Sequence, residues 1–126
     1  MSGGRILVVE DNDKSMKLFR DVLLATGYRT LEATTGGEAF QLAAEHAPDL
    51  VLMDIQLPDL DGVQALRRLR ADARTAAIPV LALTAQAMHG DRERFLAAGF
   101  DGYVSKPVNV HELLGTVRRH CDRPAG

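Results

Sequence analysis

The chain contains one cysteine, Cys121, so no disulfide bond can form within it. A cysteine-poor composition suits a reducing compartment, and the sequence predicts a cytoplasmic protein. No apolar run approaches the ~20 residues that a membrane-spanning helix needs. The N-terminal segment also lacks the longer apolar region and small-residue cleavage site of a signal peptide. A disulfide scaffold, a membrane protein and a secreted protein are therefore not expected.

An excess of charge of one sign is also lacking. The 126 residues include 15 basic and 17 acidic side chains, which gives a net charge of −2. This balance provides no bulk attraction to nucleic acid or to an anionic membrane. The four histidines (His46, His89, His111 and His120) show no metal-ligand spacing with one another or with the cysteine. Direct binding to nucleic acid and a zinc site are therefore both disfavoured.

Short apolar runs recur along the chain, which is long enough for one domain. We expect this domain to span residues 1–126, with an ordered core over about residues 5–120. The first, third and fourth runs are apolar throughout, which is typical of strands covered on both faces. The second is only half apolar and indicates an edge strand. The runs are Ile6–Val9, Thr30–Ala33, Leu50–Met53, Val80–Leu83 and Tyr103–Val104.

Amphipathic helical patterns lie between and after these runs, the clearest over Val110–Cys121. Asp13, Asp61 and Asn109 stand where N-caps of the first, third and fifth helices are expected. Gly99 is expected to end the fourth helix. Strand and helix alternating five times predicts an α/β fold with a parallel sheet and helices on both faces.

Polar side chains follow the ends of four predicted strands. Glu10 and Asp11 follow the first, Asp54 the third, Thr84 the fourth and Lys106 the fifth. The carboxyl ends of parallel strands meet at one edge of a sheet, so these side chains should converge. Three close carboxylates repel one another, and without compensation at least one pKa should rise. A divalent cation relieves this repulsion, and oxygen ligands without histidine or cysteine suit Mg²⁺ or Mn²⁺.

Asp54 has a plausible role at such an edge as a nucleophile that attacks a phosphoryl group and forms an acyl phosphate. Lys106 and the metal would neutralise the transferring oxygens, and Thr84 would offer its hydroxyl to one of them. Each residue alone is more often a cap, a loop residue or a solvated surface charge. The joint pattern at four strand ends favours the chemical interpretation.

The same segments resemble the receiver domains of bacterial response regulators, over about residues 5–120. Narrower features resemble single-domain regulators of the DivK type, which act in the bacterial cell cycle. The resemblance implies a flavodoxin-like (βα)5, doubly wound, five-stranded parallel sheet with strand order 2-1-3-4-5. The motifs are Val8-Val9-Glu10-Asp11-Asn12, Leu52-Met53-Asp54-Ile55-Gln56-Leu57-Pro58, Asp61-Gly62, Leu83-Thr84-Ala85 and Tyr103-Val104-Ser105-Lys106-Pro107.

The resemblance also implies a role for each matching residue. Asp54 matches the phosphoryl acceptor, and Glu10 and Asp11 match the acidic pair that holds Mg²⁺. The backbone carbonyl of Gln56 matches a further metal ligand. Three more residues match positions that concern the phosphoryl group and the response to it. Thr84 and Lys106 match the hydroxyl and amine that contact this group, Tyr103 matches the aromatic switch residue, and the Lys106-Pro107 bond is expected to be cis.

The function implied is a signalling switch and not an enzyme, although receivers assist their own phosphorylation and dephosphorylation. A sensor histidine kinase or a histidine phosphotransfer protein would supply the phosphoryl group. A downstream protein would read the face formed by residues 88–98, Tyr103 and the last helix, and a second copy could bind there after phosphorylation. Only a few residues follow the last helix. If the chain is full length, output is expected through protein contacts, and if it is cut from a larger regulator, the output lies in the missing part.

Three alternatives belong to other classes. An aspartate-nucleophile phosphohydrolase commonly has a second aspartate two residues after the nucleophile, where this chain has Gln56. A flavodoxin-like mononucleotide binder should donate hydrogen bonds to phosphate after the first strand, where Glu10 and Asp11 would repel it. A binding module that never takes a phosphoryl group is disfavoured by the intact acceptor set but stays open at this point.

Overall fold

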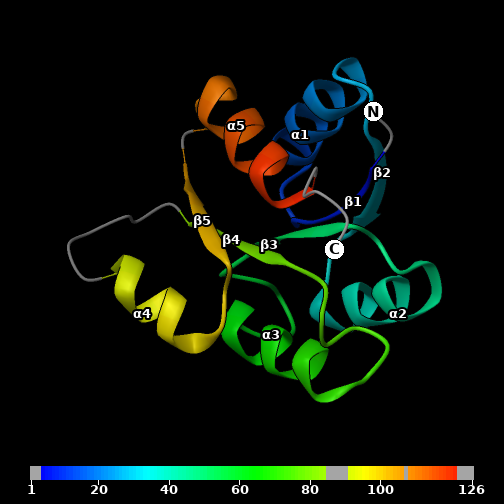
Figure 1. Cartoon of the computed structure of the whole chain (residues 1–126), viewed down its shortest axis with the longest axis vertical. Helices are drawn as coiled ribbons and strands as arrows, with labels where there is room; N and C mark the ends of the chain where they lie inside the picture. The colour runs from blue at the N-terminus through cyan, green and yellow to red at the C-terminus, as the bar shows by residue number, and fades with distance from the viewer. Residues whose placement is uncertain (1–3, 85–90, 107, 122–126) are drawn as a thin grey trace.

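The apolar runs form the strands of one parallel sheet, as expected from their composition (Figure 1). The structure is a computed structural model that describes residues 4–84, 91–106 and 108–121. Its strand order, β2-β1-β3-β4-β5, confirms the predicted α/β fold and topology. The elements are β1 (Arg5–Val9), α1 (Asp13–Ala25), β2 (Arg29–Ala33), α2 (Gly36–His46), β3 (Leu50–Asp54), α3 (Gly62–Ala71), β4 (Val80–Thr84), α4 (Asp91–Ala98), β5 (Gly102–Ser105) and α5 (Val110–Cys121).

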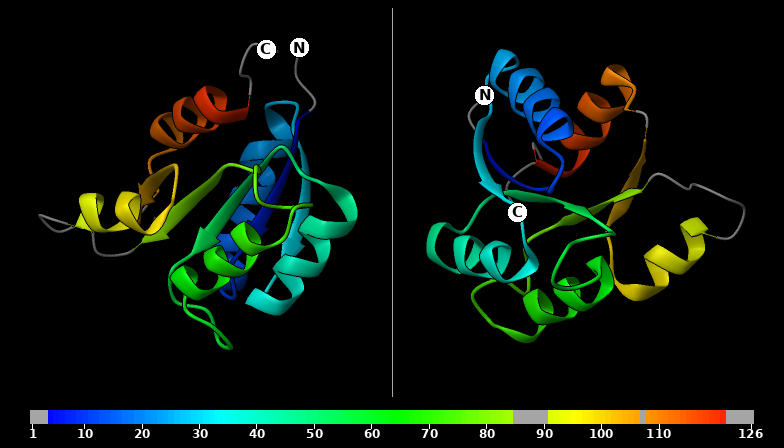
Figure 2. Two further views of the ribbon diagram at one scale, coloured as in Figure 1. Left: turned by 60° about the horizontal axis from the view of Figure 1, so that its bottom comes forward. Right: turned by 180° about the vertical axis from the view of Figure 1, so that it is seen from behind.

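Helices cover both faces of the sheet, and this arrangement explains the continuous apolar runs. α1 and α5 lie on one face, and α2, α3 and α4 lie on the other (Figures 1 and 2). Successive residues of a strand point to opposite faces. In β1, Ile6 and Val8 therefore pack with α1 and α5, whereas Leu7 and Val9 pack with α2 and α3. Every residue of β3 and β4 is buried, since both faces of these strands are covered.

The outer strands are less buried than the central ones. β2 pairs only with β1 and exposes Arg29 and Glu32, which confirms its prediction as an edge strand. β5 forms the opposite edge, and Val104 is the one buried residue of this strand. Among the helices of the described part of the chain, none has the length and apolarity needed to cross a membrane.

The helix ends agree with the sequence except at α1. There, Asn12 is the N-cap: its side chain accepts a hydrogen bond from the Ser15 N–H at 3.0 Å, and the predicted cap, Asp13, is the first helical residue. Asn12 takes this role because its backbone is extended (φ −87°, ψ 120°), as an N-cap requires. The Asp61 cap is confirmed as a capping box with Gln64. Asn109 also caps as predicted, accepting from the Glu112 N–H at 3.1 Å.

The fourth helix ends where glycine was expected to end it. Gly99 follows Ala98 with φ of +113°, a left-handed conformation that costs glycine little and other residues much more. The Gly99 N–H donates to the Leu96 carbonyl at 3.1 Å, which closes the last turn of α4. The chain can then reverse and enter β5 through Phe100, whose side chain is buried.

The strand order leaves a crevice at one point of the carboxyl edge. β1 and β3 are neighbours in the sheet, yet the chain leaves β1 for α1 on one face and leaves β3 for α3 on the other. The loops after the two strands therefore diverge, and an opening forms between them. Glu10, Asp11 and Asp54 lie at this opening.

A group of polar contacts around Asp101, here called the polar clamp, lies at the amino-terminal edge of the sheet, opposite the carboxyl edge. The Asp101 carboxylate accepts hydrogen bonds from Arg70 Nη2 at 2.9 Å and from the Val80 N–H at 2.8 Å. It thus ties α3 to the start of β4 and to the turn before β5. Arg70 also donates to the carbonyls of Ala76, Ile78 and Gly99.

We expect Asp101→Ala to lower the free energy of unfolding by about 2–3 kcal/mol, because a charged acceptor and the partner of the Val80 N–H are both lost. Asp21→Ala is the matched control. Asp21 forms an exposed pair with Lys17 at 2.7 Å, and losing such a pair costs less than about 0.5 kcal/mol. Urea unfolding of both variants checks this, and equal losses would contradict the clamp.

Candidate functional site

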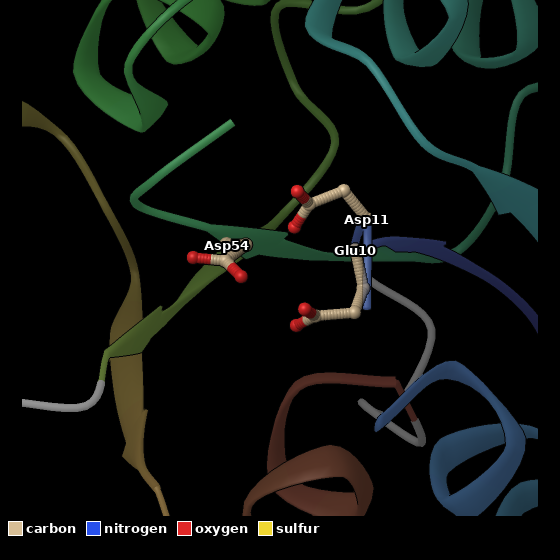
Figure 3. Close-up of side chains that lie close together, drawn as sticks. All are labelled: Glu10, Asp11 and Asp54. Atoms are coloured by element: carbon tan, nitrogen blue, oxygen red, sulfur yellow. The ribbon is translucent and has the colours of Figure 1, made fainter. Parts of the chain in front are cut away.

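Three carboxylates meet at the carboxyl edge of the sheet. Glu10 and Asp11 follow β1 directly, and Asp54 is the last residue of β3. Each offers one oxygen, and these three oxygens lie within 4.8 Å of one another. Figure 3 shows the side chains converging on a common space between the two strand ends. The structure therefore brings together the acidic residues that the sequence predicted to converge.

The three carboxylates differ in exposure. Glu10 is 1% exposed and Asp54 is 7% exposed, whereas Asp11 lies in solvent. The backbone N–H of Glu10 continues the sheet by donating to the Ala33 carbonyl at 3.0 Å. Its buried carboxylate accepts from the Asn12 N–H at 3.2 Å. Burying such groups is costly unless they are paired, so the surrounding donors determine how the site is stabilised.

Lys106 supplies the principal counter-charge. Its Nζ donates to Glu10 Oε2 at 2.6 Å and to Asp54 Oδ2 at 3.0 Å. The backbone holds it there, because the Lys106 N–H donates to the Thr84 carbonyl at 2.7 Å beside the end of β4. From the sequence, Lys106 is expected to contact a phosphoryl group. In this structure its ammonium joins two carboxylates, an arrangement that the sequence did not reveal.

The pKa values of this pair reflect their burial and their contact. Burial raises the pKa of Glu10 above its ordinary value, and nearby Asp54 raises it further, although the hydrogen bond from Lys106 opposes both. Burial alone would lower the pKa of Lys106, but its hydrogen bonds to Glu10 and Asp54 outweigh that effect and raise it. Lys106 therefore stays charged. The expected rise of a carboxyl pKa is present, with burial and not repulsion as its largest cause.

The Asp54 side chain is held by a donor at each oxygen. Oδ1 accepts from the Gln56 N–H at 2.8 Å, and Oδ2 accepts from Lys106. The loop after β3 is folded back on itself. The backbones of Gln56 and Asp61 pair in an isolated antiparallel β-bridge, and the Gly62 N–H donates to the Ile55 carbonyl at 2.7 Å. This fold places both the Gln56 backbone and Asp54 at the same opening.

Gly62 permits this tight loop. A Cβ at Gly62 would lie 2.8 Å from Ile55 Cα and 2.9 Å from the Asp54 carbonyl oxygen, both backbone atoms that cannot move aside cheaply. Glycine is therefore required for the close approach of α3 to the end of β3. The sequence marked Gly62 as part of a motif, and the structure supplies the steric reason.

Asp59 was missed by the sequence analysis. Its carboxylate accepts from the Gly36 N–H at 2.7 Å and from the Gly37 N–H at 3.0 Å, joining the loop after β3 to the start of α2. These two hydrogen bonds lower the pKa of Asp59. The loop that carries Gln56 is thereby anchored on both sides. No local pattern indicates this contact, because the partners are more than twenty residues apart.

The site opens into a cavity of about 650 Å³ that also contains Thr84 and Lys106. Thr84 is 7% exposed at the end of β4. Two residues of α4, Arg94 and Phe95, line the same cavity. The sequence placed them on the expected output face, residues 88–98, and did not predict their position at this site. The cavity is lined by Glu10, Asp11, Asn12, Ser15, Asp54, Ile55, Gln56, Leu57, Pro58, Thr84, Arg94, Phe95 and Lys106.

Tyr103 lies elsewhere. It is half-buried on β5 and lines a second cavity of about 660 Å³ beside α5, together with Leu96 of α4. Pro107, with its expected cis bond, and residues 88–90 of the expected output face lie outside the described residues. The structure thus separates the predicted switch residue from the acidic cavity.

The acidic cavity suits a small divalent cation. Three carboxylate oxygens converge on it, and no histidine or cysteine is among its described lining residues. Hard oxygen ligands with room for water and one more oxygen are the preference of Mg²⁺, whereas zinc sites usually include nitrogen or sulfur. The residues present therefore fit Mg²⁺, and this fit rests on their chemistry.

Comparisons with known proteins agree with this geometry. A family model described as the response regulator receiver domain matches residues 6–118. The polar-differentiation response regulator DivK of Brucella ovis is 46% identical over 115 residues, which cover 91% of this chain and 94% of that protein. The chain is therefore similar to a curated regulator over nearly the whole length of both.

Two solved structures extend the comparison. The receiver domain of the sensor histidine kinase PA1611 from Pseudomonas aeruginosa, with magnesium coordinated in its active-site cleft, is 38% identical with a TM-score of 0.88, covering 97% of this chain and 100% of that one. A co-crystal structure from Saccharomyces cerevisiae holds the phosphotransfer protein Ypd1 and the receiver domain of Ssk1. It matches at 27% identity and a TM-score of 0.86, covering 96% and 90%.

Asp11 gives a direct test of the repulsion in this site. Without divalent cations, we expect Asp11→Asn to raise the free energy of unfolding by about 0.5–1 kcal/mol, because one of three close negative charges is removed. With excess Mg²⁺ the order should reverse, since the wild-type site gains more from binding. Urea unfolding in EDTA and in Mg²⁺ measures both. A lower midpoint for the variant in EDTA would contradict the repulsion.

Proposed function

The chain belongs to the response regulator receiver domain family, and on this premise we propose that Asp54 accepts a phosphoryl group and that phosphorylation changes the contacts of this protein with others. The observation that carries the proposal is the position of Asp54. Its carboxylate lies at an open cavity, beside Glu10 and Asp11, with Lys106 at 3.0 Å. The same geometry supplies a nucleophile, a counter-charge and oxygen ligands within one site.

Asp54 acts as the nucleophile in the proposed transfer. One carboxylate oxygen forms a bond to phosphorus while the bond from phosphorus to the donor breaks, and the donor leaves with that electron pair. For a phosphohistidine donor, the bond that breaks is nitrogen to phosphorus. The hydrogen bonds from Gln56 and Lys106 orient the Asp54 carboxylate for this attack.

Glu10, Asp11 and Asp54 would hold Mg²⁺, with the backbone carbonyl of Gln56 as a further ligand. When bound, Mg²⁺ supplies positive charge against the carboxylates and the transferring oxygens. Lys106 contributes a second positive charge, exchanging carboxylate partners for a phosphoryl oxygen. The Thr84 hydroxyl donates a hydrogen bond to another of these oxygens. The same groups can assist hydrolysis of the acyl phosphate, so the protein promotes its own dephosphorylation while acting as a switch.

The proposed donors are a sensor histidine kinase and a histidine phosphotransfer protein. Two similar structures support this choice: one is the receiver domain of a sensor histidine kinase, and the other is a receiver in a co-crystal with a phosphotransfer protein. The DivK likeness favours a role in polar differentiation and the cell cycle, and we place the protein in the cytoplasm with these partners.

The proposed output surface consists of α4, β5 and α5. Tyr103 and Leu96 line its cavity of about 660 Å³, and Leu96 is an exposed apolar side chain. Phosphorylation of Asp54 adds charge at the end of β3 and draws Thr84, at the end of β4, toward it, which shifts an existing equilibrium of α4 and Tyr103. A downstream protein, or a second copy of the chain, would then bind this surface with a different affinity.

Intact mass after incubation with acetyl phosphate and Mg²⁺ tests the acceptor. We expect the wild-type chain to gain one phosphoryl group, the Asp54→Asn variant to gain none, and EDTA to prevent the gain. Circular dichroism of the variant checks that it is folded. If the folded wild-type chain never gains mass, the proposal is wrong, and the protein is a binding module that takes no phosphoryl group.

A second measurement tests the switch without a known partner. Beryllofluoride with Mg²⁺ should shift the amide resonances of Gly102–Ser105 and of residues 93–98 in the wild-type protein. In Thr84→Ala we expect beryllofluoride still to bind, while the shifts at Tyr103 fall by at least about half, because the hydroxyl that couples the two sites is gone. Thr30→Ala, on the edge strand β2, is the control and should leave them unchanged. If the Tyr103 shifts in Thr84→Ala equal those of the wild type, Thr84 does not couple the two sites.

A further inference from the structure

α4 brings a second cationic side chain to the acidic cavity. Arg94 lines the cavity together with Asp54 and Lys106. Its guanidinium carbon lies 5.2 Å from the centroid of the Phe95 ring. Phe95 is itself buried and packs edge-on against Phe100, with ring centroids 6.1 Å apart. The ring therefore offers a fixed surface for the guanidinium, whose planar N–H groups can still reach an oxygen beside the ring.

The charged groups that line the cavity indicate what Arg94 could bind. Glu10, Asp11 and Asp54 are negative, and Lys106 already donates to two of them, at 2.6 and 3.0 Å. The phosphoryl group on Asp54 carries a charge of about −2, in place of the −1 of the carboxylate, and has three acceptor oxygens. Lys106 exchanges its contact with Asp54 for one phosphoryl oxygen and cannot pair with all three. A planar guanidinium suits phosphoryl oxygens, since it can form two parallel hydrogen bonds to them.

We propose that Arg94 binds the phosphoryl group carried by Asp54 and so ties α4 to the phosphorylated site. The inference rests on the proposed function and adds a residue to it. It also gives α4 a direct link between two surfaces. Arg94 lines the acidic cavity, and Leu96, two residues later, lines the cavity beside Tyr103. A contact between Arg94 and the phosphoryl group would therefore move or hold the helix that forms part of the output surface.

Beryllofluoride affinity in the presence of Mg²⁺, measured by calorimetry, tests this contact. We expect Arg94→Gln to weaken beryllofluoride binding by about fivefold or more, as the loss of one charge-assisted hydrogen bond implies. Arg94→Lys keeps the charge and should recover part of the affinity. Mg²⁺ affinity without beryllofluoride should not fall in Arg94→Gln, because removing a positive charge beside the carboxylates favours a cation. A loss confined to beryllofluoride therefore separates binding of the phosphoryl group from folding and from metal binding.

Arg67→Gln is the matched control, because Arg67 is an exposed arginine of α3 that does not line the cavity. It should stay within about twofold of the wild type, since only long-range charge is changed. An unchanged affinity in Arg94→Gln, or an equal loss in Arg67→Gln, would overturn the assignment. The Asp54 mass measurement separates the two proposals: a wild-type chain that is phosphorylated while Arg94→Gln binds normally refutes the Arg94 contact alone.

Discussion

The contact of Lys106 with two buried carboxylates is the interaction on which the site depends. Glu10 and Asp54 could not both be buried beside Asp11 without a nearby positive charge, because their repulsion and desolvation would oppose folding. Lys106 relieves part of this cost from a strand that lies two positions away from β3 in the sheet. The remaining excess of negative charge suits the site to the cation that we propose. Stability and function therefore oppose each other at this edge, as is common in active sites.

The fold meets this constraint with rigid supports around the acidic residues. Backbone hydrogen bonds place Lys106 beside Thr84 and place Glu10 beside β2. Gly62 lets α3 approach the end of β3, and Asp59 fastens the intervening loop to α2. These contacts leave the Asp54 carboxylate oriented before any ligand arrives, so the proposed phosphoryl transfer would need little reorganisation. The helix α4 lines both the acidic cavity, through Arg94, and the cavity beside Tyr103, through Leu96.

Much of the fold could be predicted from sequence because its signals are local. Runs such as Leu50–Met53 are apolar throughout only when helices cover both faces of a strand, and β3 is buried along its whole length. Helix ends were less certain, as Asn12 and not Asp13 caps α1. The two side chains are adjacent and both favour capping, so the choice depends on the backbone angles at the end of β1. The acidic residues could also be predicted to converge, since parallel strands end at one edge.

The sequence by itself determined which residue types reach the carboxyl edge of the sheet, because the spacing of apolar residues shows where along the chain each strand ends and which residues follow it. Only the tertiary structure decided how those residues pair. The bridging position of Lys106, the anchoring of the β3 loop by Asp59, and the entry of Arg94 into the cavity each join segments far apart in the chain. Such contacts leave no local pattern, since their geometry depends on the packing of helices against the sheet and not on the identity of neighbouring residues.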